Sequence, residues 1–370
     1  MNQNHKFPYR WTLKDAVFTK DKGKVFSCFA CGGGSTMGYK LAGFDVIGCN
    51  EIDPRMNKVY VANHHPRFNF LEPIQTFNFL EPIQTFKLRK DLPKELYQLD
   101  ILDGSPPCSS FSTTGVRDRD WGKEKKFREG QASQVLDTLF FDFIDLAKEL
   151  QPKVVIAENV KGLLLGEAKE YVRRIYAGFQ DAGYTLCHTL VDAQYMGVPQ
   201  RRERVFFTAI RNDLLPYVPQ YDTLFETIPT IDLNFHETPI FFDEFYMPGV
   251  DDRPCSQGLM KQYWDKRKPE DVDFRNTVQR EWGEAKCFSN RYLKLGEVCS
   301  TFTANSDVLY LYDEYRKPNR EEVCCISSFP QDYDFQSEPY YYICGMSVPP
   351  IMMAQVASAV YDQWITKLPR

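Results

Sequence analysis

Histidine and long apolar runs are scarce in this chain. Only 5 of its 370 residues are histidines, and the pair Cys28-x-x-Cys31 has no second such pair to complete a metal site. We therefore expect no bound metal. No apolar run reaches the roughly 18 residues of a membrane-spanning helix, and the first residues contain no apolar signal core. We expect a cytoplasmic protein that does not enter a membrane.

A surplus of positive charge is also missing, because the formal net charge is −5. Contact with nucleic acid would therefore depend on local basic patches. The 11 cysteines are scattered along the chain, which favours reduced thiols over a disulfide framework. The hydrophobic share of 43% is sufficient for a globular core.

Strand-like and helix-like stretches alternate through the first 211 residues. The predicted strands are Lys24–Phe29, Asp45–Asn50, Leu99–Asp103, Val154–Glu158, Thr185–Val191 and Arg204–Ile210. Apolar residues at helical spacing predict a helix over Gln134–Leu150. This alternation predicts an α/β fold with a Rossmann-like, doubly wound, mostly parallel sheet, which binds ligands at the carboxyl ends of its strands.

The composition changes after residue 211. Residues 212–252 contain nine acidic residues and no Lys or Arg, whereas residues 253–298 contain ten basic and seven acidic residues. We expect a boundary near 211, followed by a smaller irregular domain. Its candidate phosphate-binding side chains are Lys261, Lys266, Arg267, Lys268, Arg275, Arg280 and Arg291. A solvated mixed-charge surface is the alternative.

One nine-residue segment occurs twice in tandem, as Phe68–Thr76 and Phe77–Thr85. Two short copies are too few for a solenoid. We expect a lengthened surface loop, because loops accept insertions at low cost.

A cysteine follows two prolines directly after a predicted strand, in Ser105-Pro106-Pro107-Cys108. Proline fixes its own φ and disfavours a helical residue before it. We therefore expect the Cys108 thiol on a stiff, exposed turn, which suits a nucleophile. A buried cysteine is the structural alternative.

Polar groups follow three other predicted strands. The glycine-rich turn Phe29–Ser35 allows the backbone to approach a ligand, and Glu51 after the second strand could bind ribose hydroxyls. Glu158 closes the fourth strand and could donate a proton. The arginines of Gln200–Arg204 could clamp a carbonyl or a phosphate. A ligand-free turn and a solvated charge cluster are the plain alternatives.

The order of these motifs resembles the cytosine-5 DNA methyltransferase family. Arg316, Glu322 and Phe329-Pro330 resemble its ninth motif, and Tyr342–Pro350 resembles its tenth. The resemblance covers roughly residues 22–211 and 295–370. It implies a cofactor-binding catalytic domain over 1–211 completed by 341–370, a target-recognition domain over 212–298, and a hinge with the ninth motif over 299–340.

The resemblance implies methyl transfer from S-adenosylmethionine to C5 of a cytosine flipped out of duplex DNA, with S-adenosylhomocysteine as the product. Cys108 would add to C6, Glu158 would protonate or hydrogen-bond N3, and Arg204 would hold O2. Arg202 would belong to the same catalytic set.

Two larger residue sets follow from the resemblance. The implied cofactor set is Phe29, Ala30, Cys31, Gly32, Gly33, Gly34, Glu51, Ile52, Pro107 and Ser347. The implied DNA-contacting set is Ser109, Arg117, Arg119, Lys266, Arg267, Lys268 and Arg291. The segment Ser109–Ser133 resembles the loop that closes over the flipped base, although a plain surface loop would have a similar composition.

The chain departs from the family pattern at three points. Cys31 stands where the family has glycine, Met346 interrupts the usual Gly-Asn-Ser of the tenth motif, and the third motif shows no clear aspartate. We therefore expect weak cofactor binding with intact chemistry.

Two alternatives remain open at this point. A tRNA-acting branch shares the motifs, and its Cys-Phe-Thr signature has an echo in Cys287-Phe288-Ser289. A catalytically inactive DNA-binding relative is the second alternative, although Cys108, Glu158 and Arg204 are all present. We expect a monomer that acts on double-stranded DNA. The recognised sequence, and a partnership with a separately encoded restriction endonuclease, stay open.

Overall fold

In the computed structural model the chain forms two compact units. The sheet unit comprises Val17–Asp192, Glu203–Phe235 and Met352–Arg370, and the small unit comprises Met1–Ala16, Ala193–Arg202 and His236–Ile351. The structure describes residues 5–70, 87, 90–107, 124–125, 134–135, 138–166, 168–223, 226–287, 289–304 and 308–369, with the backbone alone for 124–125 and 134–135. The functional domain boundaries expected from the sequence stay predictions.

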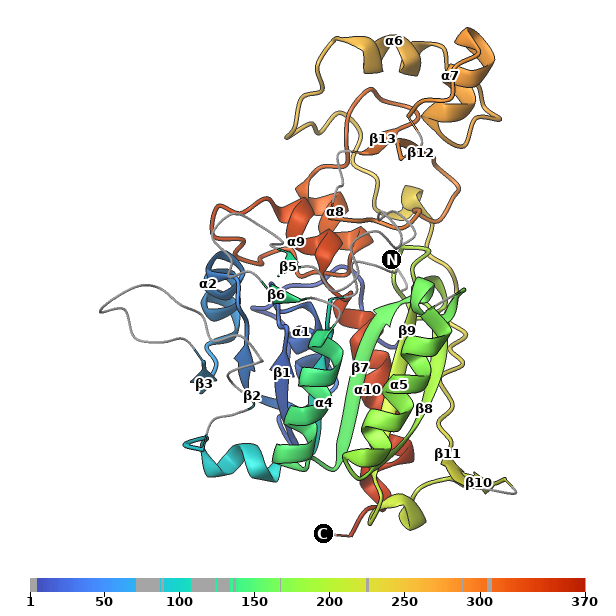
Figure 1. Ribbon diagram of the computed structural model, residues 1–370. Helices are drawn as coiled ribbons and strands as arrows, with labels where there is room; N and C mark the ends of the chain where they lie inside the picture. The colour runs from blue at the N-terminus through green and yellow to red at the C-terminus, as the bar shows by residue number, and fades with distance from the viewer. Residues whose placement is uncertain are drawn as a thin grey trace. The chain divides into compact units, whose positions relative to one another are not determined.

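A seven-stranded sheet forms the centre of the sheet unit, in the order β3-β2-β1-β4-β7-β9-β8 (Figure 1). Its strands are β1 (Lys24–Cys28), β2 (Asp45–Asn50), β3 (Phe68–Asn69), β4 (Ile101–Gly104), β7 (Val154–Val160), β8 (Tyr184–Asp192) and β9 (Glu203–Arg211). All neighbours pair in parallel except β9, which is antiparallel to β7 and β8. The six predicted strands and the mostly parallel sheet are confirmed.

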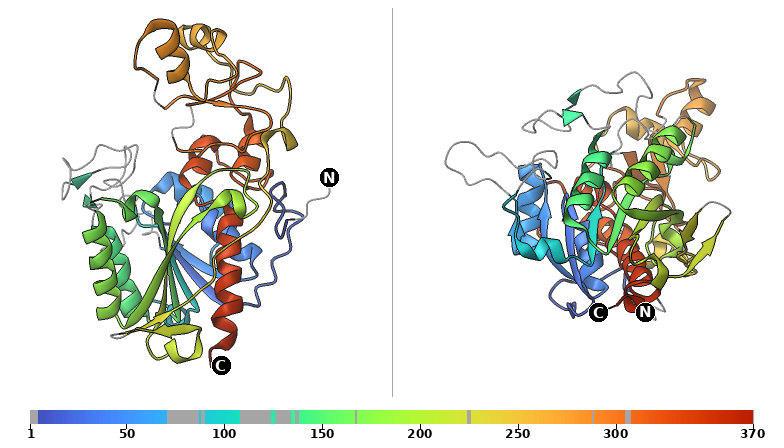
Figure 2. Two further views of the ribbon diagram at one scale, coloured as in Figure 1. Left: turned by 90° about the vertical axis from the view of Figure 1, so that its right-hand side faces the viewer. Right: turned by 60° about the horizontal axis from the view of Figure 1, so that its bottom comes forward.

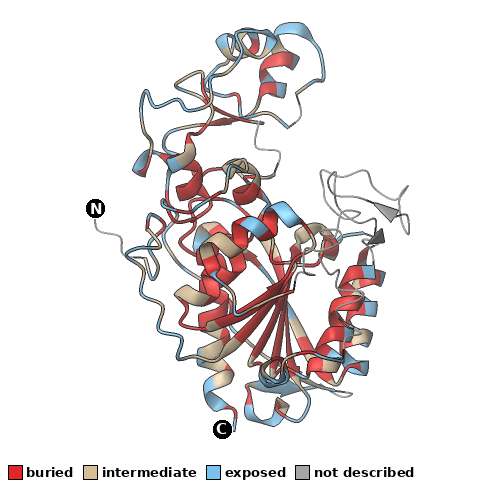
Figure 3. Ribbon diagram, turned by 90° about the vertical axis from the view of Figure 1, so that its left-hand side faces the viewer, coloured by how far each residue is buried: buried red, intermediate tan, exposed pale blue. Residues whose placement is uncertain are grey.

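Helices lie on both faces of this sheet. The regular helices are α1 (Gly34–Leu41), α2 (Pro54–His64), α4 (Leu139–Leu150), α5 (Ala168–Asp181) and α10 (Pro350–Gln363). Helices α4 and α5 cover one face, and α10 lies on the other (Figure 2). The strands between them are buried (Figure 3). The predicted start of the helix at Gln134 is wrong, because the helix begins at Leu139 and Gln134–Val135 forms a short strand.

Shorter elements complete the sheet unit. They are the 3-10 turns η1 (Lys94–Gln98), η4 (Lys161–Leu164), η6 (Leu215–Tyr217) and η9 (Ile365–Lys367), with the antiparallel pairs β5 (Glu124–Lys125)–β6 (Gln134–Val135) and β10 (Gln220–Asp222)–β11 (Thr227–Pro229).

The strand order reverses beside β1. Strands β2 and β3 extend the sheet on one side of β1, whereas β4 and β7 extend it on the other. In doubly wound sheets the carboxyl ends on either side of such a switch point border the ligand crevice. Here these ends lead into the glycine-rich turn after β1 and the proline turn after β4.

The small unit contains four helices and a short parallel strand pair among its described residues. Its elements are η5 (Ala193–Tyr195), η7 (Phe242–Glu244), α6 (Leu259–Asp265), α7 (Phe274–Trp282), β12 (Arg291–Leu293), β13 (Leu309–Leu311), α8 (Arg320–Ile326) and α9 (Tyr340–Met346). Aromatic rings fill the core beside α6 and α7, where Phe274 stacks on Tyr292 with 4.5 Å between ring centroids.

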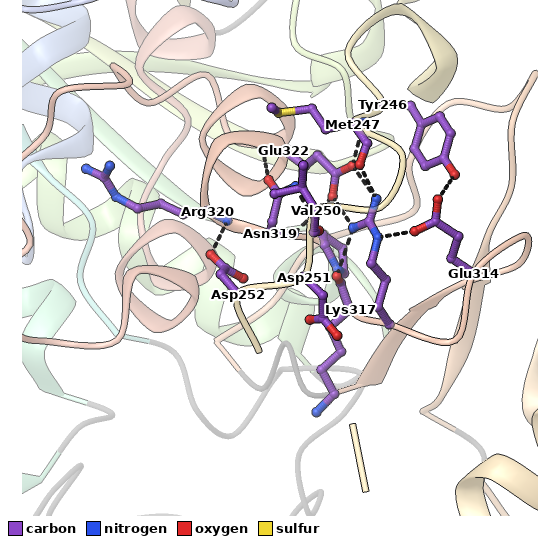
Figure 4. A network of polar contacts seen from close by, with 12 residues as sticks. Tyr246, Met247, Val250, Asp251, Asp252, Glu314, Lys317, Asn319, Arg320 and Glu322 are labelled. Carbon is purple, nitrogen blue, oxygen red and sulfur yellow. Dashed lines mark hydrogen bonds and ion pairs between the residues drawn. The ribbon is translucent and has the colours of Figure 1, made fainter. Parts of the chain in front are cut away.

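A buried ion-pair network organises the middle of the small unit (Figure 4). The Arg316 guanidinium donates to both carboxylate oxygens of Glu322, at 2.7 and 2.9 Å, and to Glu314 at 2.7 Å. Glu322 also accepts from the backbone amides of Met247 and Asn319, each at 2.9 Å. Because both partners of the Arg316–Glu322 pair are buried, removing either one would leave an uncompensated charge.

Among the described residues, one stretch is long and apolar enough by composition to cross a membrane, Tyr340–Lys367. Its most apolar window is 89% buried inside the protein. Such burial is typical of a core helix.

Close packing at the end of β4 gives a first prediction. A Cβ atom on Gly104 would lie 2.5 Å from Cε2 of Phe143. We expect Gly104→Ala to lower the free energy of unfolding by about 1–3 kcal/mol, because overpacking forces the ring or the strand to move. The control Gly178→Ala meets the flexible end of Ile144 at 3.2 Å. In denaturant titration the control should unfold at or above the wild-type midpoint, and equal midpoints for the two variants would contradict this account.

Candidate active site

The pairing of β7 with β9 brings Glu158 and Arg204 together. Val160 lies opposite Arg204 in the antiparallel register, so Glu158 is two residues away on the same face. Arg204 Nε is 2.9 Å from Glu158 Oε1, and the two side chains are only 14% and 9% exposed. Burial lowers the pKa of Arg204, although the Glu158 charge opposes this change. The structure thus joins two of the predicted catalytic residues in a largely buried ion pair.

Asn159 connects this pair to the proline turn. Its Nδ2 donates to the carbonyl of Pro106 at 3.1 Å, and this hydrogen bond is buried. The contact is possible because β4 and β7 run in parallel, with Gly104 opposite Ala157. The turn that leads through Pro107 towards Cys108 is therefore anchored beside Glu158. Cys108, Ser109, Arg117 and Arg119 lie outside the described residues.

A buried carboxyl group that the sequence analysis missed lies on the same face of the sheet. Asp103 is 1% exposed and accepts from Ser27 Oγ at 2.7 Å and Tyr39 Oη at 3.2 Å. Asp103 lies opposite Ile156, so it shares a sheet face with Glu158. Burial raises the pKa of Asp103 to about 7, and the Glu158 charge adds to this effect. The sequence feature that could have identified Asp103 is an aspartate at the end of a predicted buried strand, Leu99–Asp103.

The glycine-rich turn after β1 has an unusual backbone. Phe29, Cys31 and Gly33 have φ values of 55°, 47° and 87°. This left-handed region is favourable for glycine and strained for other residues. Cys31 therefore has a backbone conformation that favours glycine, the residue expected at this position from the family resemblance. Gly33 caps α1, with no side chain to cover the first helical amides.

Glu51 joins the glycine-rich turn to the end of β2. Its carboxylate accepts from the backbone N–H of Cys31 at 2.6 Å and of Asp53 at 2.8 Å. Burial raises the pKa of Glu51 to about 7, against the lowering effect of these hydrogen bonds. Asp53 caps α2 by accepting from Arg55 N and Met56 N.

The residues around these strand ends fit a cofactor with a ribose and polar groups. Ala30, Gly32, Gly33 and Gly34 are buried, whereas Phe29, Cys31, Ile52 and Pro107 are half-buried. The Ser105 Oγ atom is buried without a hydrogen-bond partner in the described part of the chain. Together with the Glu51 carboxylate, it provides polar groups that a bound molecule could satisfy. Among the described residues, no group of three or more His, Cys, Asp or Glu could hold a metal ion.

One predicted catalytic residue, Arg202, and one predicted cofactor residue, Ser347, belong to the small unit. The buried guanidinium of Arg202 donates to the carbonyls of Phe302 at 2.6 Å, Gly345 at 3.2 Å and Ser347 at 3.0 Å. Arg202 thus holds the backbone of the tenth motif, and its catalytic role stays a prediction. Ser347 is 4% exposed, and its Oγ has no hydrogen-bond partner within the described ranges.

The basic side chains of the small unit differ in their availability to a ligand. The Cζ atom of Arg267 lies 3.2 Å from the centroid of the Trp264 ring, and Arg267 Nε donates to the Tyr312 carbonyl at 2.6 Å. Lys261 pairs with Asp265, and Arg280 pairs with Asp271 and Glu281. The exposed side chains of Lys266, Lys268 and Arg291 form no ion pair with another described residue. Of the predicted DNA contacts that the structure describes, these three therefore keep their charged groups outside ion pairs with described residues.

The fold has the architecture of methyltransferases. A prophage-encoded DNA modification methyltransferase of E. coli superimposes with a TM-score of 0.61 at 21% identity, over 92% of this chain and 99% of that one. Residues 23–362 match the C-5 cytosine-specific DNA methylase profile, and the chain belongs to this family.

Curated relatives agree with this assignment. The type II methyltransferase M.FnuDI of Fusobacterium nucleatum is 33% identical over 192 residues, which are 52% of this chain and 48% of that protein. M.Eco47II of Escherichia coli is 28% identical over 379 residues, with 96% and 81% coverage. The chain thus spans about half the length of M.FnuDI and most of M.Eco47II.

The buried Asp103 gives a prediction about the pH dependence of stability. Its folded pKa is raised from 3.8 to about 7, so the stability that it contributes is present below about pH 4 and lost as the pH rises through 7. Between pH 6 and 8 the free energy of unfolding of the wild type should fall by about 1.4 kcal/mol relative to that of Asp103→Asn. This change corresponds to one proton titrating around pH 7.

Denaturant unfolding at pH 6 and pH 8 measures this difference directly. The exposed Asp145, which pairs with Lys87, provides the control variant Asp145→Asn. If the free energies of unfolding of Asp103→Asn and the wild type differ by the same amount at both pH values, the result would count against a raised pKa at Asp103.

Proposed function

We propose that the protein methylates C5 of a cytosine in a specific site of duplex DNA, with S-adenosylmethionine as the methyl donor, as a bacterial or phage modification enzyme. The observation that carries this proposal is the buried Glu158–Arg204 pair beside the Asn159-anchored proline turn. Membership of the C-5 cytosine-specific DNA methylase family supports it.

The chemistry requires a nucleophile because C5 of cytosine is itself a poor one. The Cys108 thiolate, directly after the anchored Pro106-Pro107 turn, forms a bond to C6 of the ring and shifts electron density to C5. The methyl group comes from S-adenosylmethionine when it is bound. Loss of the C5 proton then restores the double bond and breaks the C6–sulfur bond. The base must leave the helical stack first, at a cost of a few kcal/mol.

Glu158 and Arg204 stabilise the ring while the thiol is attached. Glu158 donates a proton or a hydrogen bond to N3, which offsets the charge that develops in the ring. Arg204 orients this carboxyl group through its Nε, 2.9 Å from Oε1, and its guanidinium holds the O2 carbonyl. Burial strengthens both interactions because water competes less for them.

The cofactor and DNA sites follow the same assignment. Glu51 holds the ribose hydroxyls, the turn from Phe29 to Gly34 and Ile52 line the cofactor, and Pro107 lies beside its methionine end. Ser347 contributes from the tenth motif. Lys266, Lys268 and Arg291 contact DNA phosphates. The protein acts in the cytoplasm as a monomer, with a separately encoded restriction endonuclease as a candidate partner.

We expect weak binding of the cofactor. Cys31 holds a left-handed conformation with φ of 47° where the family has glycine, and Met346 is 38% exposed in place of an amide side chain. Calorimetric titration with S-adenosylmethionine should give a dissociation constant above the order of 1 μM, or a binding free energy weaker than about −8 kcal/mol. A sub-micromolar constant would contradict this expectation.

Methyl transfer from labelled S-adenosylmethionine tests the proposed function. The wild type should label duplex DNA and leave tRNA unlabelled. Glu158→Gln should lower kcat by roughly 100-fold or more, because it cannot donate a carboxyl proton. Its control is Glu203→Gln, since Glu203 is an exposed carboxylate that pairs with Lys161 at 2.8 Å, and this variant should keep wild-type kcat.

Each other outcome has a definite meaning. Labelling of tRNA in place of DNA would identify the RNA-acting alternative. Absence of transfer to either nucleic acid, by a folded wild type that binds duplex DNA, would identify the inactive relative.

A further inference from the structure

Three consecutive basic residues follow α6 in the small unit, on the connection to α7 (Figure 1). They are Lys266, Arg267 and Lys268, the basic segment. The two lysines are exposed, whereas the arginine between them is half-buried. The contacts of the segment within the small unit differ in the same way, because they engage its backbone and its arginine rather than its lysine side chains.

The backbone on both sides of the arginine is tied to α7. Arg280, on that helix, donates from Nη2 to the Lys266 carbonyl at 2.6 Å and from Nη1 to the carboxylate of Asp271. Asp271 is 3% exposed and also accepts from Thr277 Oγ1 at 2.8 Å. The backbone N–H of Lys268 donates to the same carboxylate at 2.9 Å, and the Lys268 carbonyl accepts from the Asp271 amide at 2.9 Å. Both lysines therefore project from a fixed backbone.

The side chain of Arg267 is used inside the small unit. Its Nε donates to the Tyr312 carbonyl at 2.6 Å and its Nη1 to the Trp264 carbonyl at 2.9 Å. Its guanidinium also lies against the Trp264 ring, which is itself held by a hydrogen bond from Nε1 to the Leu311 carbonyl at 2.7 Å. The planar guanidinium thus joins the end of α6 to β13 and the residue that follows it.

These contacts leave the two lysine ammonium groups available to a ligand. Neither Lys266 nor Lys268 forms an ion pair with another residue in the described part of the chain. An ammonium group is a compact charge that can meet a phosphate from many directions, whereas a guanidinium favours a fixed planar partner. A side chain on an ordered backbone also loses less freedom on binding than one on a loose loop.

We propose that Arg267 is a positioning residue, which fixes the basic segment so that Lys266 and Lys268 are preorganised to contact DNA phosphates. Arg267, expected from the family resemblance to contact DNA, then acts through its two neighbours. Phosphate contacts of this kind set the position of the protein on the duplex without reading its sequence. The inference rests on the proposed function, because it requires duplex DNA as the ligand.

The salt dependence of duplex DNA binding distinguishes a phosphate contact from a positioning residue. Loss of one phosphate contact lowers the slope of log Kd against log salt concentration by about 0.9. We expect this decrease in Lys266→Gln and in Lys268→Gln. In Arg267→Met the Kd should rise about fivefold while the slope stays at the wild-type value, because the lysines still reach the phosphates but from a looser backbone.

A conservative variant sharpens the comparison. Arg267→Lys keeps the positive charge but lacks the planar group that contacts Trp264 and the Tyr312 carbonyl. It should bind duplex DNA as weakly as Arg267→Met. The control for the loss of one arginine charge is Arg173→Met, since Arg173 is exposed on α5 of the sheet unit and pairs with Glu170 at 3.0 Å. This control should keep the wild-type Kd and slope.

Amide hydrogen exchange without DNA gives an independent result. The peptide that contains residues 264–268 should exchange faster in Arg267→Met and Arg267→Lys, and at the wild-type rate in Lys266→Gln. Peptides from β1 and β4 should exchange at the wild-type rate in all variants, which shows that the sheet unit is folded.

The opposite results are equally specific. Wild-type affinity in Arg267→Lys, or a slope lowered by about 0.9 in Arg267→Met, would identify Arg267 as a direct phosphate contact and overturn the proposal. An unchanged slope in both lysine variants, with a wild type that binds duplex DNA, would overturn this inference alone. A wild type that binds no duplex DNA would overturn the proposed function as well.

Discussion

The ion pair between Glu158 and Arg204 is the interaction on which the site depends. Two charged side chains that are 9% and 14% exposed are costly to remove from water unless each compensates the other. The antiparallel pairing of β7 with β9 supplies this compensation, since it sets both residues on one sheet face. A shift of this register by one residue would turn one partner to the opposite face. The sheet register and the site chemistry are therefore fixed together.

Acidic groups concentrate at the carboxyl ends of the central strands. Glu51 after β2, Asp103 in β4 and Glu158 in β7 are all buried, and among the described residues Glu158 alone of the three pairs with an arginine. Burial raises the pKa of both Glu51 and Asp103 to about 7. A carboxyl group with a raised pKa in the folded state lowers the stability of the fold at neutral pH. Such destabilising groups are typical of functional sites. Hydrogen bonds from Ser27, Tyr39 and backbone amides reduce the cost without removing it.

Much of this arrangement was predictable from the sequence because apolar strands carry a local signal. The run Val154–Ala157 before Glu158 is apolar throughout, and the alternation of such strand-like runs with helix-like stretches predicted the mostly parallel sheet. The start of α4 was less predictable, since apolar spacing continues before Leu139, whereas Gln134–Val135 forms a short strand. Helix boundaries depend on local hydrogen bonds that periodicity does not encode.

Side-chain partnerships were the part that sequence patterns could not provide. Arg202 and Arg204 are neighbours in one motif, yet Arg202 binds carbonyls of the tenth motif and Arg204 binds Glu158. Arg267, expected at a phosphate surface, lies against Trp264. Asp103 has no motif of its own, because its role depends on partners from another strand and from a helix. Such pairings follow from register and packing, which are properties of the folded chain.

The central claim is that the anchored proline turn presents Cys108 to the ring that Glu158 and Arg204 bind. The most direct measurement is covalent capture on duplex DNA containing 5-fluorocytosine, where fluorine blocks the final elimination and traps the C6–sulfur bond. With S-adenosylmethionine present, the wild type should form an adduct that survives denaturation, and mass spectrometry should locate it on the peptide that contains Cys108. The adduct should be absent in Cys108→Ala. An adduct on another cysteine, or one that persists in Cys108→Ala, would contradict the account.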